Sequence, residues 1–186
     1  SVACQNDAAF SLPGTSDNGI TGSWTPALNL TVPGSFTYNF NPAANQCANP
    51  ASVQITVQPQ AEPVFTHPTT LCQNDPFVLP VTAQNGITGT WNPQVNSQQV
   101  GSTAVTFTPD AGQCSNSVNQ TIVVNATPTN AITQNGITLS SAATGVTYQW
   151  IDCNTNQPVL GATNQSFTTT EPIGTYAVIV TANGCS

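Results

Sequence analysis

A short stretch that occurs twice constrains the fold of this chain more than any other feature. Asn-Gly-Ile-Thr-Gly-Ser-Trp occupies residues 18–24, and Asn-Gly-Ile-Thr-Gly-Thr-Trp occupies residues 85–91, a shift of 67 positions. Asn-Gly readily takes positive φ and reverses the chain. Ile20, Gly22 and Trp24 then share one face of an extended segment. A turn and strand that return after so many residues predict tandem domains.

The motifs around this stretch repeat in the same order. Cys-Gln-Asn-Asp precedes it at residues 4–7 and again at residues 72–75. A strongly alternating segment follows each copy, and Gln-Cys comes after that segment at Cys47 and Cys114. The duplication defines repeat 1 as residues 1–60 and repeat 2 as residues 61–126.

Residues 127–186 form a more divergent repeat 3. Gly174 begins an alternating segment, and Cys185 then stands where Cys47 and Cys114 stand. The Asn-Gly-Ile-Thr at residues 135–138 looks like a third copy of the opening stretch, but its distance to Trp150 places it one strand earlier. Repeat 3 stops one residue after Cys185, so we expect it to lack its last strand.

Each repeat predicts six or seven short strands separated by turn signals, with no useful helical periodicity. The expected fold class is all-β: tandem small antiparallel β-sandwiches of immunoglobulin-like type, with a tryptophan on a central strand. Trp24, Trp91 and Trp150 lie on alternating segments, as core residues do. We therefore expect these three side chains to be core anchors rather than an exposed sugar-binding platform.

The six cysteines fall into three well-spaced pairs, and none forms a Cys-x-x-Cys metal motif. They predict disulfides formed in an oxidising compartment. We expect one disulfide in each repeat, because a small core benefits from a cross-link. The expected pairs are Cys4–Cys47, Cys72–Cys114 and Cys153–Cys185, each worth roughly 3–4 kcal/mol in the chain-entropy model.

The charge composition excludes several classes of partner. The 186 residues include no Lys or Arg, seven Asp plus Glu and one His. Nothing is present to neutralise phosphate, so we expect no nucleic-acid partner and no docking on anionic lipid. No apolar run of about 18 residues occurs, so we expect no membrane insertion. Together with the cysteines, these features predict an exported, acidic protein.

Neither a catalytic nor a strong metal-binding constellation is evident. The acids are mostly placed in turns, where Asp commonly bonds its own backbone: Asp7, Asp17, Glu62, Asp75, Asp110, Asp152 and Glu171. His67 is the single histidine, so a serine–histidine–acid arrangement has no second candidate base. We expect no enzymatic activity and no cofactor. Ca²⁺ at the recurring Asp7 and Asp75 is the one alternative, set against a simple turn after the cysteine.

The motifs resemble the tandem repeats of very large cell-surface proteins of the Bacteroidota. Cys-Gln-Asn-Asp, Asn-Gly-Ile-Thr-Gly-Ser/Thr-Trp and Gln-Cys are similar to repeats of gliding-motility adhesins of the SprB type, which are cargo of the type IX secretion system. Tyr-Gln-Trp-Ile-Asp-Cys-Asn at residues 148–154 resembles the immunoglobulin-like repeats of the same proteins. The resemblance covers essentially the whole chain and implies surface display. It implies no catalytic residues.

These observations predict a non-catalytic extracellular segment of an adhesin or structural filament, built as a rod of three modules. Its expected partners are neighbouring repeats of the same protein. We expect a segment of a longer array, with a strand donated by another copy as the alternative to missing end strands. The other functional hypotheses are a carbohydrate- or other ligand-binding module and the stalk of a secreted enzyme.

Overall fold

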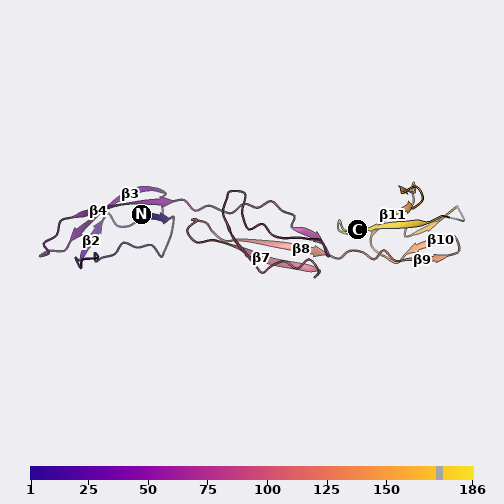
Figure 1. Cartoon of the computed structure of the whole chain (residues 1–186), viewed down its shortest axis with the longest axis horizontal. Helices are drawn as coiled ribbons and strands as arrows, with labels where there is room; N and C mark the ends of the chain where they lie inside the picture. The colour runs from indigo at the N-terminus through magenta and orange to yellow at the C-terminus, as the bar shows by residue number, and fades with distance from the viewer. Residues whose placement is uncertain (171–173) are drawn as a thin grey trace. The chain divides into compact units, whose positions relative to one another are not determined.

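The computed structural model describes residues 1–170 and 174–186, and every regular element in these ranges is a β-strand. Figure 1 shows the strands in chain order. The protein is all-β and consists of immunoglobulin-like repeats in tandem, as the sequence predicts. Contacts group the chain into two compact units: residues 1–65, 80–90 and 107–118, and residues 66–79, 91–106 and 119–186. The boundary falls inside repeat 2, so each junction between repeats belongs to a single unit.

Repeat 1 is built on one four-stranded sheet in the order β1-β4-β3-β2. Its strands are β1 (Val2–Cys4), β2 (Gly22–Thr25), β3 (Gly34–Pro42) and β4 (Ala51–Gln58). β3 pairs antiparallel with β2 and with β4, while β1 runs parallel to β4 with Cys4 beside Gln58. The parallel first strand places the start of the repeat beside the end of its last strand.

Repeat 2 has the same topology, in the order β5-β8-β7-β6. Its strands are β5 (Thr70–Cys72), β6 (Gly89–Asn92), β7 (Gly101–Pro109) and β8 (Val118–Asn125). β5 is parallel to β8, with Cys72 beside Asn125. The sheet therefore preserves the duplication that the motifs predict.

Repeat 3 contains two three-stranded sheets, ordered β13-β10-β9 and β12-β11-β14. Its strands are β9 (Ile132–Asn135), β10 (Thr138–Ser141), β11 (Thr147–Asp152), β12 (Gln157–Pro158), β13 (Ser166–Thr168) and β14 (Tyr176–Thr181). β14 lies at the edge of its sheet, whereas β3 and β7 are each flanked by strands on both sides.

Regular strands are fewer than expected in repeats 1 and 2. The alternation of Phe10 and Leu12 predicts a short strand, but the segment is irregular backbone that packs these side chains against the core. Pro13, Pro26 and Pro33 border the irregular segments and donate no backbone hydrogen bond, which limits ladder formation there. One layer of each sandwich is consequently a regular sheet, and the other consists mainly of extended loops.

The cores follow the strict alternation along the long strands. In β3 and β4, Tyr38, Ile55 and Val57 are buried while their sequence neighbours face outward. Val105, Phe107, Ile122 and Val124 fill the corresponding positions in repeat 2. Trp150 is fully buried in repeat 3, among Ala143, Val178 and Val180. Full burial of each aliphatic or aromatic side chain contributes about 1.5–3 kcal/mol.

The repeated stretch forms a tight hairpin followed by a close packing contact. Gly19 and Gly86 have φ near +80° (81° and 82°), the conformation that the Asn-Gly turn requires. Thr15 bridges to Thr21 across the turn, and Gly22 then lies against the Phe40 ring. The similar Asn135-Gly136 turns the chain between β9 and β10 instead, one strand earlier, as its spacing to Trp150 predicts.

Candidate functional site

The most distinctive chemical feature of the chain is a disulfide at each junction between repeats. Cys4 of repeat 1 is bonded to Cys114 of repeat 2, with their Cα atoms 5.1 Å apart. Cys114 is buried, with 9% of its surface exposed. Ala61 donates its N–H to the Cys114 carbonyl at 2.9 Å, and the Ser115 hydroxyl donates to the Ala61 carbonyl at 2.9 Å. The disulfide joins repeat 1 to repeat 2, and these hydrogen bonds hold Ala61, the first residue of repeat 2, beside it.

The second junction repeats this arrangement. Cys72 of repeat 2 is bonded to Cys185 of repeat 3, with a Cα–Cα distance of 5.5 Å. A turn through Asn183 and Gly184, both at positive φ, presents Cys185, which is 1% exposed. The Asn125 side chain donates to the Asn183 carbonyl at 3.3 Å. In both junctions a cysteine at the end of a parallel strand meets a cysteine that follows the glycine-led strand of the next repeat.

The expected pairing within each repeat is therefore wrong, and the length of the last strand explains why. Cys4 lies beside Gln58 at the end of β4, whereas Cys47 precedes Ala51 at its start. β4 has 8 residues and so spans about 23 Å at roughly 3.3 Å per step. A disulfide needs Cα atoms within about 7 Å. Cys4 and Cys47 consequently lie at opposite ends of one repeat.

The same reasoning applies to the other two expected pairs. Cys72 lies beside the end of β8 and Cys114 precedes its start, so β8 separates them. In repeat 3, Cys153 donates its N–H to the Thr175 carbonyl at the start of β14, and Cys185 follows the end of β14. The six residues of β14 span about 17 Å, so Cys153 and Cys185 lie at opposite ends of this strand. Cys47 and Cys153 are exposed and carry no disulfide in the structure.

A glutamine holds each Gln-Cys segment in place. The Thr21 N–H donates to the Gln46 side-chain oxygen at 3.0 Å, and the Gln46 side-chain amide donates to the Thr21 carbonyl at 3.2 Å. Gln113 makes the same two bonds with Thr88, at 2.9 and 2.7 Å. The conserved hairpin therefore positions Cys47 as it positions Cys114, whether or not a disulfide is formed.

Residues 61–67, here named the lead-in segment, lie in extended conformation at the beginning of repeat 2. Pro63 is buried and Phe65 and His67 are half-buried, while the residues between them are exposed. The Phe65 ring packs edge-on against Phe107, with centroids 4.7 Å apart. The His67 ring lies 6.1 Å from that of Trp91. The segment thus behaves as a first strand that covers apolar side chains of repeat 2.

Hydrogen bonds to backbone carbonyl groups of the lead-in segment hold it in place. The Asn85 side chain donates to the Glu62 carbonyl at 2.8 Å, and the Gln84 N–H donates to the Val64 carbonyl at 2.8 Å. Asn85 belongs to the repeated turn, so the turn motif has a second role besides reversing the chain. Sequence reasoning gave this asparagine only the conformational role.

The three tryptophans differ in exposure. Trp150 is 0% and Trp91 is 3% exposed, whereas Trp24 is half-buried. The Trp24 ring nitrogen donates to the Pro13 carbonyl at 2.8 Å, and its ring lies 5.1 Å from that of Phe40. The Trp150 nitrogen donates to the Asn164 carbonyl at 3.0 Å. Trp24 is therefore more exposed in repeat 1 than its counterpart Trp91 is in repeat 2.

The candidate acids serve local turns. Asp7 accepts the Ala9 N–H at 2.9 Å, Asp75 accepts the Cys72 N–H at 3.1 Å and Asp152 accepts the Asn154 N–H at 2.8 Å. Asp110 accepts the Thr88 hydroxyl at 2.6 Å. Glu171 lies outside the described residues. Within the described ranges, no three His, Cys, Asp or Glu side chains group closely enough to hold a metal ion.

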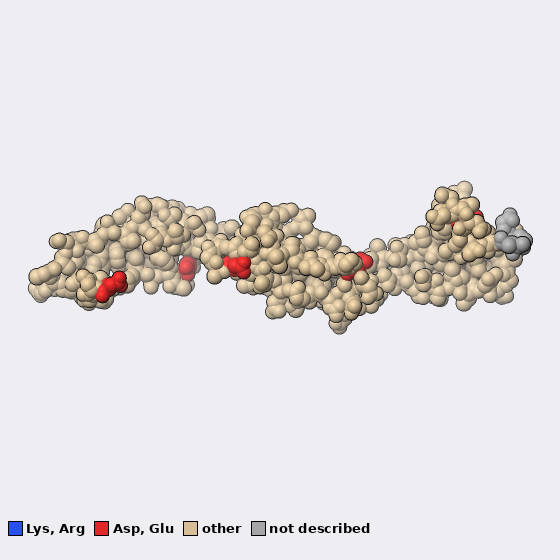
Figure 2. Space-filling view, viewed as in Figure 1, with Lys and Arg blue, Asp and Glu red and all other residues tan. Residues whose placement is uncertain are grey.

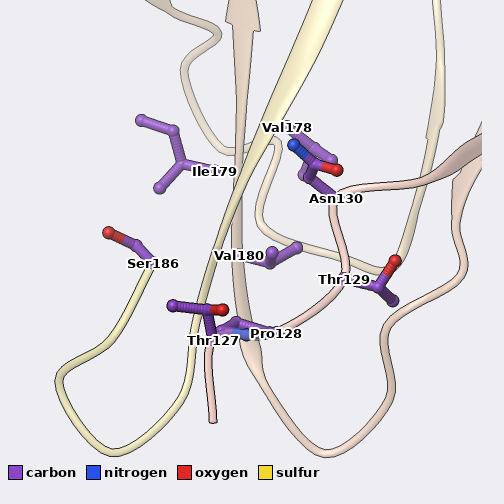
Figure 3. Close-up of a pocket in the computed structure, with 8 residues that line it drawn as sticks. All are labelled: Thr127, Pro128, Thr129, Asn130, Val178, Ile179, Val180 and Ser186. Atoms are coloured by element: carbon purple, nitrogen blue, oxygen red, sulfur yellow. The ribbon is translucent and has the colours of Figure 1, made fainter. Parts of the chain in front are cut away.

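A cavity of about 640 Å³ lies beside β14, the edge strand of its sheet in repeat 3. Figure 3 shows the side chains around it, which offer hydroxyl, amide and aliphatic groups: Thr127, Pro128, Thr129, Asn130, Val178, Ile179, Val180 and Ser186. Among these lining residues, no His, Asp, Glu or Lys side chain is present to act as a general base for a hydroxyl.

The surface shows no basic region. Figure 2 shows acidic side chains scattered singly over one face and no basic ones. The described residues contain no helix that is long and apolar enough to cross a membrane.

The fold and its junctions define the class of protein: tandem immunoglobulin-like β-repeats with disulfides between consecutive repeats. No protein-family model and no curated protein matches the chain. Among solved structures, it is similar to "Sidekick-1 immunoglobulin domains 1-5", with 14% identity and a TM-score of 0.30, over 92% of this chain. The chain spans 44% of that structure's length. At this TM-score the likeness carries no argument, so the fold rests on the strands and sheets described above.

Proposed function

We propose that this chain is a non-catalytic extracellular segment of a cell-surface adhesin or structural filament. The observation that carries the proposal is the pair of disulfides that join consecutive repeats. A cross-link within a repeat stabilises that repeat alone. A cross-link between repeats instead resists their separation, which is the property that a chain under tension needs.

The two disulfides also interleave along the sequence. Cys4 bonds forward to Cys114, and Cys72, which lies between them, bonds forward to Cys185. Three covalent routes that use a disulfide therefore run from Cys4 to Cys185. One follows the backbone to Cys72 and crosses there, and another crosses to Cys114 and follows the backbone forward. The third uses both bonds and the backbone between Cys72 and Cys114, and because it is the shortest, a force on the two ends of the unfolded chain passes through both disulfides.

This interleaving limits how far the unfolded chain can extend. Without disulfides, 186 residues reach about 630 Å at roughly 3.4 Å per residue. With both bonds intact, the shortest route contains only the backbone between Cys72 and Cys114, and the limit falls to about 170 Å. Limited extension suits a surface filament that must survive pulling.

Composition and resemblance support the extracellular part of the proposal. Disulfides persist in oxidising compartments, and a chain without Lys or Arg offers no site to trypsin-like proteases. The motifs resemble repeats of Bacteroidota surface proteins, including gliding-motility adhesins exported by the type IX system. On this basis we place the chain in a surface repeat array of that kind, with neighbouring repeats as its partners and no cofactor.

Single-molecule stretching tests the mechanical role. The oxidised chain, held by its two ends, should stop extending at about 170 Å, and the reduced chain at about 630 Å. Equal limits would refute the passage of force through the disulfides. The surface role is tested separately with antibodies against the chain on intact cells of the source organism. Labelling only after permeabilisation would overturn that part of the proposal.

Glycan binding is the competing hypothesis, and it needs accessible aromatic rings. Trp91 and Trp150 are buried, which leaves Trp24 as the only tryptophan of the three with substantial exposure. A glycan-array signal that is lost in a Trp24→Ala variant would favour the ligand-binding function over the structural one.

A further inference from the structure

The same surface is covered in repeat 2 and open in repeat 1. Five positions in and just before the repeated stretch are buried in repeat 2: Leu79, Ala83, Ile87, Gly89 and Trp91, of which Trp91 lies beside His67 of the lead-in segment. Their counterparts at the 67-residue shift are each partly exposed: Leu12, Ser16, Ile20, Gly22 and Trp24. The side chains are alike at four of the five positions. The difference in burial therefore reflects a missing cover rather than a different core.

A cavity of about 320 Å³ lies on this open face of repeat 1. Ile20, Phe40 and Cys47 line it, together with Asn18 of the repeated turn. Phe40 is the counterpart of Phe107, the ring that Phe65 of the lead-in segment covers in repeat 2. The cavity thus occupies the place where the lead-in segment lies in the next repeat.

The polar anchors of the segment are also duplicated. Asn18 corresponds to Asn85, whose side chain holds the Glu62 carbonyl. The Gln46 side chain, next to Cys47, accepts a hydrogen bond from the Thr21 N–H. The Gln113 side chain, next to Cys114, accepts the equivalent bond from the Thr88 N–H. Cys47 is exposed, whereas its counterpart Cys114 is bonded to the preceding repeat. The open face therefore carries a groove with both apolar and polar lining residues, the counterpart of the anchoring asparagine and a positioned thiol.

We propose that this face of repeat 1 is the docking site for a lead-in segment that connects a preceding module of the same repeat type to Ser1, and that Cys47 forms a disulfide there with that module's counterpart of Cys4. The proposal rests on the proposed function, since it names the partner of the same repeat array. Its evidence is internal to the chain: an equivalent segment and an equivalent cysteine occupy the equivalent site of repeat 2.

The covalent step is an ordinary thiol–disulfide oxidation. The two cysteine thiols together lose two protons and two electrons, and one S–S bond forms between them. A small-molecule disulfide such as oxidised glutathione accepts the electrons and protons and becomes two thiols. The groove brings the two thiols together, as the covered face does at Cys114.

The first test adds a module to the complete chain. A copy of residues 1–68 is fused directly before Ser1, because Cys4 and Cys72 are 68 positions apart and Ser1 therefore corresponds to Thr69. Cys47 of the added copy is replaced by Ser, so that Cys47 of the original repeat is the only thiol at this position. The protein is refolded with reduced and oxidised glutathione and digested after its acidic residues without reduction.

Mass spectrometry then reads the linkage. The proposal predicts loss of the Cys47 thiol and a cross-link between peptide 18–110, which contains Cys47 of the original repeat, and peptide 1–7 of the added copy. A free Cys47, a bond between Cys47 side chains of two chains, or a bond from Cys47 to Cys4 of its own repeat would each overturn it. The purified protein suffices, so the result is independent of where the protein resides on a cell.

A second test isolates the groove from the cysteine chemistry. Residues 60–68 are fused directly before Ser1 of the native chain, and hydrogen–deuterium exchange is measured for residues 18–25. The proposal predicts slower exchange in the fusion than in the native chain. A control fusion whose lead-in segment carries Phe65→Ser should lose this protection. Equal exchange in the two fusions would refute docking in the groove.

Discussion

Breaking the first junction tests the disulfide connectivity most directly. The perturbation is the double variant Cys4→Ser, Cys114→Ser, which removes the bond without leaving an unpaired thiol. The bond closes a separation of 110 residues. In the chain-entropy model a loop of this size stabilises the folded state by about 4.8 kcal/mol. The second disulfide does not shorten this loop, because the route through Cys72 and Cys185 is longer.

Cys47→Ser is the matched control. Cys47 is exposed and carries no disulfide, so its replacement should change the free energy of unfolding by less than about 0.5 kcal/mol. If Cys47 were instead bonded to Cys4, the loop of roughly 40 residues would be worth about 4 kcal/mol, and Cys47→Ser would remove all of it. The two connectivities therefore differ in the effect of a single substitution.

The assay is urea unfolding at equilibrium, followed by tryptophan fluorescence and far-ultraviolet circular dichroism. Coincident transitions from the two probes justify converting midpoints to free energies. The double variant should lose about 4.8 kcal/mol and Cys47→Ser almost nothing. A loss of about 4 kcal/mol in Cys47→Ser would refute the connectivity and the argument from strand length.

The acidic residues make an independent check of the linkage straightforward. Cleavage after Asp and Glu, except where proline follows, places Cys4 in peptide 1–7, Cys47 and Cys72 in peptide 18–110, Cys114 in peptide 111–152, and Cys153 and Cys185 in peptide 153–186. Without reduction, peptide 1–7 should be joined to peptide 111–152, and peptide 18–110 to peptide 153–186. Joining of peptide 1–7 to peptide 18–110 would contradict the structure.

Four further outcomes are expected. Gly22→Ala should lower the free energy of unfolding in urea by about 1–3 kcal/mol, because the new Cβ would meet the Asn41 carbonyl oxygen and the Phe40 ring. Gly14→Ala is the control, since its Cβ has room and the substitution should be nearly neutral. Phe65→Ala should cost about 2 kcal/mol through lost burial and lost ring contact with Phe107, and an unchanged midpoint would contradict the role of the lead-in segment. A single backbone cut anywhere between the first and last bonded cysteines should leave one species on a non-reducing gel and two after reduction, because the disulfides interleave. Trypsin should leave the denatured, reduced chain whole, since it contains no Lys or Arg.

Local features of the chain were predictable because they depend on short-range geometry. The Asn-Gly turn needs positive φ at the glycine, and both Gly19 and Gly86 adopt it. Alternation of large apolar residues predicts the long strands, and β3 and β7 bury those residues on one face. The spacing to Trp150 correctly separates the Asn135-Gly136 turn from the true copies. The all-β, tandem immunoglobulin-like class follows from these elements.

Strand content in the second layer was less predictable. The alternation of Phe10 and Leu12 resembles that of a strand, but both residues lie in irregular backbone. Alternation reports which side chains face the core, whereas a strand also needs a partner for its hydrogen bonds. Prolines near these segments remove donors, and short-range pattern does not reveal that loss.

The sequence by itself determined the duplication, the fold class, the alternating strands and the residues available for chemistry. Tertiary structure alone decided which cysteines meet. That choice depends on β1 running parallel to β4, which puts Cys4 at one end of repeat 1 while Cys47 stays at the other. Spacing along the chain cannot distinguish a partner in the same repeat from one in the next, because both are far away in sequence. The distance along one strand, about 23 Å, excludes the first and leaves the second.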